Sequence, residues 1–444
     1  MQEYITELSR YGIAAVMLIY TVIGFAAFFS GRENSRGIYR FQCALIFLLQ
    51  LICFTDLAVV SRDYQYVFFY LFVQIFLLAA TVMVPIIYET ANRLLLNNMC
   101  MLLGMGLCII SRISFRKALK QYIIALVALA LSLTIPYLLT RIRFLKKLTW
   151  YYAAAGILLL AGVLLLGQVT NGSKIRVTLF DAITFQPSEF VKILFLFFLA
   201  GALWEKRTIH RVAVTAAVAG VHVLVLVFSR DLGSALVFFV GYVFVVFAAT
   251  GNALYLLAGT VGGSAAAWVA YRFFPHVQER VLAWQEPWNY LSNESWAVTQ
   301  SLFAMGSGSW FGMGLLSGRP QTIPYVEQDF IFSALCEELG VVVGVCLIFV
   351  TLNCFLLLCG MAARIRDRFY QLIVFGAGIM YCFQTFLTVG GGMNLIPLTG
   401  VTLPFLSYGG SSCMTTMLLF FIIQGIYIRM QQEGGERHAD RAEG

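Results

Sequence analysis

The sequence contains few charged residues. Asp, Glu, Lys and Arg make up 12% of its 444 residues, whereas about a quarter of a typical soluble domain is charged. The apolar fraction is 60%, so too little polar material exists to cover a soluble globule. This composition excludes an ordinary soluble enzyme and indicates that the lipid bilayer is the solvent for most of the chain.

Several motifs of soluble chemistry are also absent. The chain has no Walker-type phosphate loop, and Gly312, Gly314 and Gly318 have the wrong spacing for a dinucleotide loop. Its four histidines are scattered, which disfavours a Ser-His triad or a histidine metal site. The ten cysteines show no C-x-x-C spacing and lie in or beside apolar stretches, so we interpret them as small apolar residues. The net charge of +8 comes from separate clusters rather than a basic stripe with aromatic residues, which disfavours nucleic-acid binding.

Long apolar runs take the place of these motifs. A helix needs roughly 20 apolar residues to cross about 30 Å of hydrocarbon, and it satisfies its own backbone polar groups. We therefore predict an all-α, polytopic integral membrane bundle with about thirteen spans. The expected spans are roughly 11–30, 41–60, 66–88, 97–112, 120–140, 147–168, 187–203, 209–228, 232–250, 252–272, 330–358, 370–390 and 403–428.

Basic residues in short loops predict the orientation of the chain, because Lys and Arg concentrate on the cytoplasmic side. Four such loops alternate consistently and are predicted to be cytoplasmic: 31–40, 141–147, 205–211 and 361–368. The N-terminus and the long loop 273–329 are then external, and the C-terminus is cytoplasmic. The basic cluster from Arg112 to Lys120 disagrees with this rule, because it falls on the external side.

Two polar segments complete the organisation of the chain. Loop 273–329 holds four of the seven tryptophans, whose amphipathic rings favour the membrane interface. We predict that this loop lies along the membrane surface. The tail 431–444 is polar, and we predict that it is disordered.

The ionisable residues near membrane depth are candidate functional residues, because each is costly in hydrocarbon. Glu189 and Lys192 share a helix face at i, i+3. They form either a pair that makes insertion easier or a polar cavity wall where Lys192 meets an anionic substrate. Asp231 precedes an apolar run, so it is either an N-cap or a functional acid.

A second group of candidates lies towards the C-terminus. Asp329 stands where a long apolar run begins, with Glu337 and Glu338 further along it, so it is either an N-cap or a general base. The segment 394–412 holds two prolines and three glycines. Irregular backbone at membrane depth requires protein or a wet cavity around it, so we expect this segment to line a cavity rather than form a flexible external turn.

Five sequence elements together resemble one known family. They are Q-P-S-E-x-x-K at 186–192, D-L-G-[ST] at 231–234, a glycine-rich S-L-x-A-x-G-S-G stretch at 301–314, D-F-I-F-x-x-x-x-E-E-L-G at 329–340, and a block ending L-P-F-x-S-Y-G-G-S-S at 394–412. In this order they are similar to the SEDS family, the FtsW, RodA and SpoVE group. The resemblance covers about residues 97 to 430.

This resemblance implies a SEDS-like ten-helix core over 97–430, preceded by an N-terminal extension, 1–96, of about three spans. It implies a peptidoglycan glycosyltransferase that polymerises lipid II at the outer face of the bacterial cytoplasmic membrane, in cell shape, division or sporulation. The implied partner is a class B penicillin-binding protein. A lipid II flippase and a non-catalytic scaffold for such a protein are the alternatives.

The resemblance also assigns site residues. Asp329 becomes the catalytic residue of an inverting transfer. The implied substrate-binding residues are Gln186, Glu189, Lys192, Asp231, Arg280, Glu338 and Ser407. No cofactor is firmly implied; a divalent cation, Mg or Mn, at the lipid pyrophosphate is one option, and the metal ligands are unknown.

Overall fold

The computed structural model describes residues 2–30, 36–142, 144–170, 173–179, 183–205, 208–288 and 294–443. Arg32, Lys206 and Arg207, which contribute to the predicted cytoplasmic loops, lie outside these ranges. Twelve helical segments within them are long and apolar enough to span a membrane. This confirms the prediction of a polytopic helical membrane protein. The predicted span 187–203 is a helix of 17 residues, which corresponds to about 26 Å.

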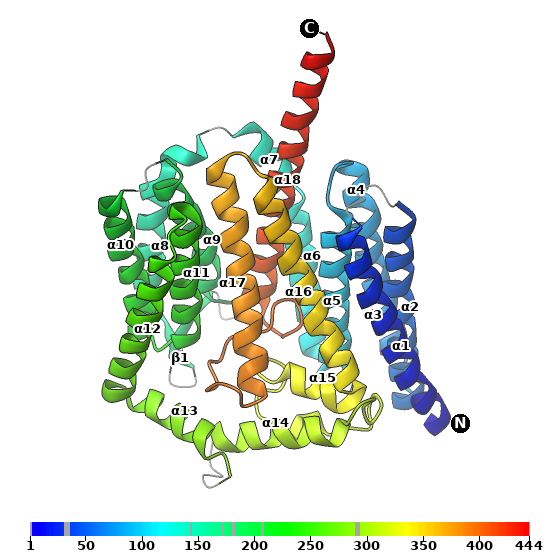
Figure 1. Ribbon diagram of the computed structural model, residues 1–444. Helices are drawn as coiled ribbons and strands as arrows, with labels where there is room; N and C mark the ends of the chain where they lie inside the picture. The colour runs from blue at the N-terminus through cyan, green and yellow to red at the C-terminus, as the bar shows by residue number, and fades with distance from the viewer. Residues whose placement is uncertain are drawn as a thin grey trace. The chain divides into compact units, whose positions relative to one another are not determined.

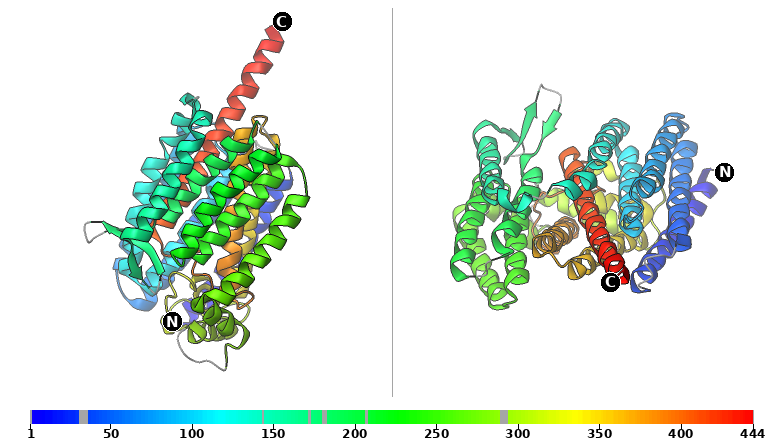
Figure 2. Two further views of the ribbon diagram at one scale, coloured as in Figure 1. Left: turned by 90° about the vertical axis from the view of Figure 1, so that its left-hand side faces the viewer. Right: turned by 90° about the horizontal axis from the view of Figure 1, so that it is seen from above.

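The chain forms two compact units (Figures 1 and 2). Unit 1 comprises Met1–Val127, Glu279–Leu357 and Thr385–Gly409. Unit 2 comprises Ala128–Gln278, Leu358–Gln384 and Gly410–Gly444. The elements in chain order are α1 (Gln2–Phe29), α2 (Arg36–Ser61), α3 (Gln65–Leu78), a π-helical turn η1 (Ala79–Met83), α4 (Val84–Ile87), α5 (Arg93–Ile113), α6 (Phe115–Ser132), α7 (Ile135–Arg141), a 3-10 turn η2 (Leu145–Leu148), α8 (Thr149–Leu166), β1 (Gln168–Thr170), β2 (Ser173–Leu179), β3 (Ile183–Phe185), α9 (Pro187–Leu203), α10 (Ile209–Phe228), α11 (Leu232–Thr250), α12 (Leu254–Phe273), α13 (Pro275–Gln285), α14 (Glu294–Gly308), a 3-10 turn η3 (Pro320–Thr322), α15 (Ile331–Leu339), α16 (Val341–Arg364), α17 (Arg368–Gly392) and α18 (Gly410–Glu443).

Helix α5 is the buried centre of unit 1. Every residue of its membrane-spanning window is buried, and α2, α3, η1 and α15 pack against it. The helix begins at an N-cap, Asn92, whose side chain accepts a 3.0 Å hydrogen bond from the Leu95 backbone N–H. The predicted fourth span, 97–112, is therefore present, and the N-terminal extension covers it.

A polar network fastens the N-terminal extension to the rest of unit 1. The Tyr20 hydroxyl of α1 donates to Asn98 Oδ1 of α5 at 2.9 Å. Asn98 Nδ2 donates to Asn353 Oδ1 of α16 at 2.8 Å, and Asn353 Nδ2 donates to the Gly24 carbonyl at 3.2 Å. Buried amides require such partners in an apolar environment, so this network fixes how α1, α5 and α16 pack.

The predicted span 330–358 is wrong for its first part, because the helix breaks at Gly340. Gly340 has a φ of +88°, a conformation that favours glycine. Its neighbour Gly312, at φ +77°, lies so close that a Cβ there would stand 2.2 Å from the Glu338 carbonyl oxygen. The Val341 and Val342 N–H groups donate to Ser309 and Trp310 carbonyls instead of continuing α15. Helix α15 is therefore a separate short helix, and the span begins at Val341.

The N-terminal end of α1 lies at the same end of unit 1 as the loop before α15 (Figure 1). Arg10 Nη1 donates to the Gly312 carbonyl at 3.3 Å, and Thr6 contacts Gly314. The N-terminal end of α1 and the segment at Gly312 to Gly314 therefore lie together in unit 1. Which face of the membrane this end occupies stays a prediction.

Two features of unit 2 differ from expectation. A three-stranded antiparallel sheet in the order β1-β2-β3 joins α8 to α9; its central strand alternates Ile175, Val177 and Leu179 with polar residues, a pattern typical of strands. Helix α18 runs to Glu443 and projects past its neighbours in unit 2 (Figure 2), where the sequence predicts a disordered tail. The Arg429–Glu433 pair at i, i+4 stabilises the helix where the tail begins.

Candidate functional site

The predicted site residues divide equally between the two units, and each group is described by itself. Unit 1 carries Arg280, Asp329, Glu338 and Ser407, and unit 2 carries Gln186, Glu189, Lys192 and Asp231.

Asp329 ends a tight turn immediately before α15. Its backbone N–H donates to the Tyr325 carbonyl at 3.1 Å, and Tyr325 has a φ of +56°. Its side chain is partly exposed. The N-cap position of α15 is Phe330, which makes no side-chain cap bond, so Asp329 is the residue directly before the cap. The carboxylate stands near the positive end of a helix.

Ser407 holds the backbone that precedes Asp329. Its hydroxyl donates to the Gln328 carbonyl at 2.6 Å and accepts from the Leu403 N–H at 2.9 Å. The neighbouring Tyr408 N–H donates to the Glu327 carbonyl at 2.7 Å. Ser407 is 3% exposed, so in this arrangement it positions the turn at Asp329 from within the protein.

The irregular segment that contains Ser407 is packed and anchored. Val401, Leu403 and Leu406 are buried, and Thr388 Oγ1 donates to the Val401 carbonyl at 2.8 Å. Gln121 of α6 bonds the segment as well: its Nε2 donates to the Ser407 carbonyl at 3.4 Å and its Oε1 accepts from the Gly409 N–H at 3.3 Å. These contacts disfavour a flexible external turn. The cavity expected along this segment stays a prediction.

Two residues of the basic cluster that disagrees with the positive-inside rule form ion pairs within unit 1. Arg112, at the end of α5, pairs with Glu338 of α15 at 2.8 Å, with side chains 8% and 1% exposed. Arg112 Nη2 also donates to the Gly318 carbonyl at 3.2 Å. Lys117 pairs with Glu327, although its side chain is 39% exposed. Two of the four cations of the cluster thus have carboxylate partners within unit 1.

Arg280 lies on α13 and joins this helix to the segment that follows α17. Its Nη1 donates to the Thr399 carbonyl at 3.4 Å. Nearby, Trp284 Nε1 donates to the Asn394 carbonyl at 3.1 Å, and Asn394 Nδ2 donates to the Trp284 carbonyl at 3.2 Å. These two hydrogen bonds fix the position of α13, the helix that carries Arg280.

In unit 2, Glu189 and Lys192 form the expected pair on α9. Lys192 Nζ lies 2.7 Å from Glu189 Oε2, with side chains 10% and 4% exposed. The same ammonium donates to Gln384 Oε1 of α17 at 2.7 Å. Gln384 was not predictable from the sequence, because an uncharged amide inside an apolar run carries no spacing signal.

A second set of contacts in unit 2 links the beginnings of α9 and α11. Gln186 Nε2 donates to Ser188 Oγ at 3.2 Å, and Ser188 Oγ donates to Asp231 Oδ2 at 3.2 Å. Asp231 Oδ1 accepts from the Ser234 N–H at 3.1 Å, so its predicted role as N-cap of α11 is confirmed. Gln186 and Asp231 therefore belong to one hydrogen-bonded chain of side chains.

Within the described part of the chain, no group of three or more His, Cys, Asp or Glu side chains could hold a metal ion.

Comparison with known proteins finds the same family over most of the chain. The family model for FtsW, RodA and SpoVE, described as "Cell cycle protein", matches residues 92–432. The chain is 32% identical over 363 residues to a peptidoglycan glycosyltransferase RodA of Mycobacterium leprae, covering 76% of this chain and 77% of the relative. It is 32% identical over 316 residues to a probable peptidoglycan glycosyltransferase FtsW of Aliivibrio salmonicida, covering 68% and 78%.

Solved structures give the same result. The chain matches a structure described as "Structural coordination of polymerization and crosslinking by a peptidoglycan synthase complex" with a TM-score of 0.63, 26% identity, and coverage of 75% of this chain and 96% of that one. It matches the rod shape determining protein RodA of Thermus thermophilus with a TM-score of 0.53, 26% identity, and coverage of 75% and 95%. From the family match, its relatives and its fold, the chain belongs to the FtsW/RodA/SpoVE family.

Proposed function

We propose that this protein is a peptidoglycan glycosyltransferase that polymerises lipid II into glycan strands at the outer face of the bacterial cytoplasmic membrane. Family membership and the names of relatives with 32% identity support the activity. The assignment of a catalytic residue rests on the position of Asp329. Its carboxylate is partly exposed, and Ser407 and Tyr408 form hydrogen bonds to the backbone of the turn that carries it.

Asp329 acts as the general base. It accepts the proton from the C4 hydroxyl of the acceptor GlcNAc while that oxygen forms a bond to the anomeric carbon of the donor. The bond from the anomeric carbon to the pyrophosphate breaks, its electron pair leaves with the lipid pyrophosphate, and the anomeric configuration inverts. The positive end of the α15 dipole interacts favourably with a negative charge at Asp329.

The negative charge that develops on the leaving pyrophosphate requires a cation. Arg280 is the candidate in the same unit as Asp329, on a helix that Trp284 and Asn394 fix. Lys192 is the candidate in unit 2, where Glu189 and Gln384 already engage its ammonium. A Mg or Mn ion bound to the pyrophosphate stays a prediction that chelation by EDTA tests, and no step above depends on it.

A class B penicillin-binding protein is the proposed partner, which would cross-link the strands that this protein makes. The match to a structure described as a peptidoglycan synthase complex supports a partner of this kind.

The test is polymerisation of labelled lipid II by the purified full-length protein, read as a ladder of glycan chains on a gel. We expect Asp329→Asn to abolish the ladder while the protein keeps its thermal unfolding temperature. The matched control is Asp63→Asn, which alters an exposed carboxylate in the turn between α2 and α3 of the same unit. A full ladder from Asp329→Asn would refute the assignment of the base.

Two further outcomes separate the alternatives. Lipid II crossing sealed vesicles without acceptor and without a ladder would favour a flippase. Stable binding of a penicillin-binding protein with no ladder in its presence would favour a scaffold.

A further inference from the structure

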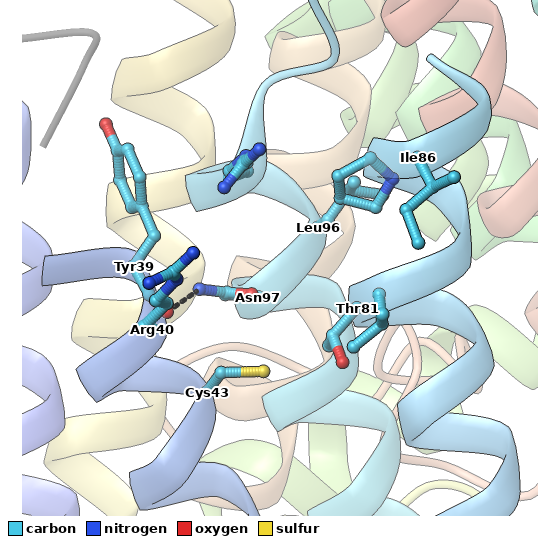
Figure 3. A pocket seen from close by; sticks show the side chains of 10 residues that line it. Tyr39, Arg40, Cys43, Thr81, Ile86, Leu96 and Asn97 are labelled. Atoms are coloured by element: carbon cyan, nitrogen blue, oxygen red, sulfur yellow. Dashed lines mark hydrogen bonds between the residues drawn. The ribbon is translucent and has the colours of Figure 1, made fainter. Parts of the chain in front are cut away.

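A cavity of about 260 Å³ lies within unit 1, away from every predicted site residue. It opens between the start of α2, the π-helical turn η1 with α4, and the start of α5 (Figure 3). Its lining includes Arg40, Thr81, Val82, Ile86, Arg93 and Asn97.

The cavity stands at a membrane boundary. Arg40 is close to the start of the span Gly37–Ser61, Arg93 is the first residue of the span Arg93–Ile113, and Ile86 is next to the end of the span Gln65–Ile87. Three helix ends therefore meet at one level, where lipid headgroups lie.

This level is opposite the end of unit 1 that carries Asp329. Helix α5 runs from Arg93 at the cavity to Arg112, which pairs with Glu338 of α15. Nineteen residues of helix rise about 28 Å, which matches the roughly 30 Å of bilayer hydrocarbon. In the predicted orientation the cavity faces the cytoplasmic leaflet.

The cavity is cationic. Figure 3 shows the side chains of Arg40 and Asn97 among those around it, and Arg93 adds a second guanidinium. Neither arginine forms an ion pair with any acidic residue that the structure describes. Asn97 Nδ2 donates to the Tyr39 carbonyl at 3.1 Å, and the Thr81 hydroxyl donates to the Leu77 carbonyl at 2.7 Å. The two guanidinium groups are therefore the donors that an anion would meet.

One side of the cavity continues into an exposed apolar surface. Val82 and Ile86 line the cavity and are 42% and 65% exposed, and the adjacent Met83 and Ile87 are also exposed. These residues belong to η1 and α4, where the π-helical turn interrupts the regular helix. A soluble anion would gain nothing from this surface, whereas an acyl chain attached to a phosphate would pack along it.

We propose that this cavity binds an anionic phospholipid of the leaflet opposite Asp329. Arg40 and Arg93 hold its phosphate by charge-assisted hydrogen bonds, and its acyl chain lies along Val82 and Ile86. Arg40, Val82 and Ile86 precede the family match, which begins at residue 92, whereas Arg93 lies within it. The site therefore joins the extension to the family core through a lipid, and it does not rest on the proposed enzymatic activity.

The test measures phosphatidylglycerol retained by the purified full-length protein, using native mass spectrometry after exchange into detergent with defined lipid. A basic residue near an anionic lipid surface contributes a factor of about five to binding, so we expect about fivefold weaker binding for Arg40→Gln or Arg93→Gln and more for the double variant. Zwitterionic phosphatidylcholine should bind weakly to every form. The matched control is Arg141→Gln, which removes an exposed arginine at the end of α7 in unit 2.

Two additional variants and two soluble ligands extend the test. Arg40→Lys with Arg93→Lys retains both charges and should retain most of the binding, which covers the case in which the double Gln variant does not fold. Ile86→Ser should weaken binding of long-chain phosphatidylglycerol and leave deacylated glycerophosphoglycerol unaffected. Unchanged phosphatidylglycerol binding in a folded double Gln variant would overturn the proposal. Inorganic phosphate that binds the wild type as tightly as the lipid would replace it with a free-phosphate site.

Discussion

The hydroxyl of Ser407 donates a 2.6 Å hydrogen bond to the carbonyl of Gln328, the residue directly before Asp329. Two segments nearly 80 residues apart are thus joined at the base of the turn that carries the proposed catalytic carboxylate. The sequence analysis places Ser407 against substrate. The structure shows it bonded to main chain, where it determines how that turn is held.

Ser407→Ala should reduce polymerisation at least tenfold without abolishing it. The change leaves the buried Leu403 N–H without its acceptor, at a cost of about 1 to 3 kcal/mol, and releases the Gln328 carbonyl. The measurement is the ladder assay with a titration of lipid II. A positioning role predicts a lower rate at saturating substrate, whereas loss of substrate contact alone would raise the half-saturating concentration. Ser30→Ala, which removes a hydroxyl bond at the end of α1, is the control.

Replacing only one member of the Glu189–Lys192 pair should destabilise the protein more than replacing both. Lys192→Met leaves a buried carboxylate without its cation, which costs about 3 to 5 kcal/mol. Adding Glu189→Gln removes that unpaired charge and should restore most of the thermal stability. If the pair serves only insertion and packing, the double variant should also recover its activity. If Lys192 contacts an anionic substrate, stability returns and activity does not.

Arg112→Met should destabilise unit 1 far more than Lys117→Met. The Arg112–Glu338 pair is almost completely buried, so removing the guanidinium leaves an unpaired carboxylate beside α15, at a cost of about 3 to 5 kcal/mol. The Lys117 side chain is 39% exposed, and pairs this accessible contribute about 1 kcal/mol or less. Thermal unfolding of the two variants under identical detergent conditions makes the comparison. Equal losses would contradict it.

Asn98→Ala should weaken the attachment of the N-terminal extension more than Tyr20→Phe. Asn98 contacts both Tyr20 and Asn353, so its loss leaves two buried polar groups without partners. Tyr20→Phe removes one hydroxyl, and hydrogen bonds between membrane helices average about 0.6 kcal/mol. Limited proteolysis of the chain between α3 and α5 measures this attachment. If Asn98→Ala is cleaved at the wild-type rate, the network does not hold the N-terminal extension in place.

The sequence could predict the helical membrane fold because a span is mainly a matter of length and apolar content. It could not predict the break at Gly340, since the apolar run resumes directly after it and a single glycine inside a helical pattern does not by itself mark a break. The sheet at 168–185 was missed for a related reason: its alternating pattern covers too few residues to stand out between two spans.

The candidate site was predictable where charge made a residue costly in lipid, as at Glu189 and Lys192. Their partner Gln384, and Gln121 beside Ser407, were not predictable, because neutral amides are tolerated at many buried positions. Asp329 was identified through the resemblance, since its residue type and position alone favoured an N-cap. The structure assigns that cap position to Phe330.

The enclosure of α5 has a consequence for biosynthesis. Chains are made from the N-terminus, so α1 to α3 enter the membrane before α5 leaves the ribosome. When Asn97 and Asn98 arrive, Gln42 and Tyr20 are already in place to receive them. The extension can thus act as an insertion template, so that Asn97 and Asn98 find polar partners as α5 enters the membrane.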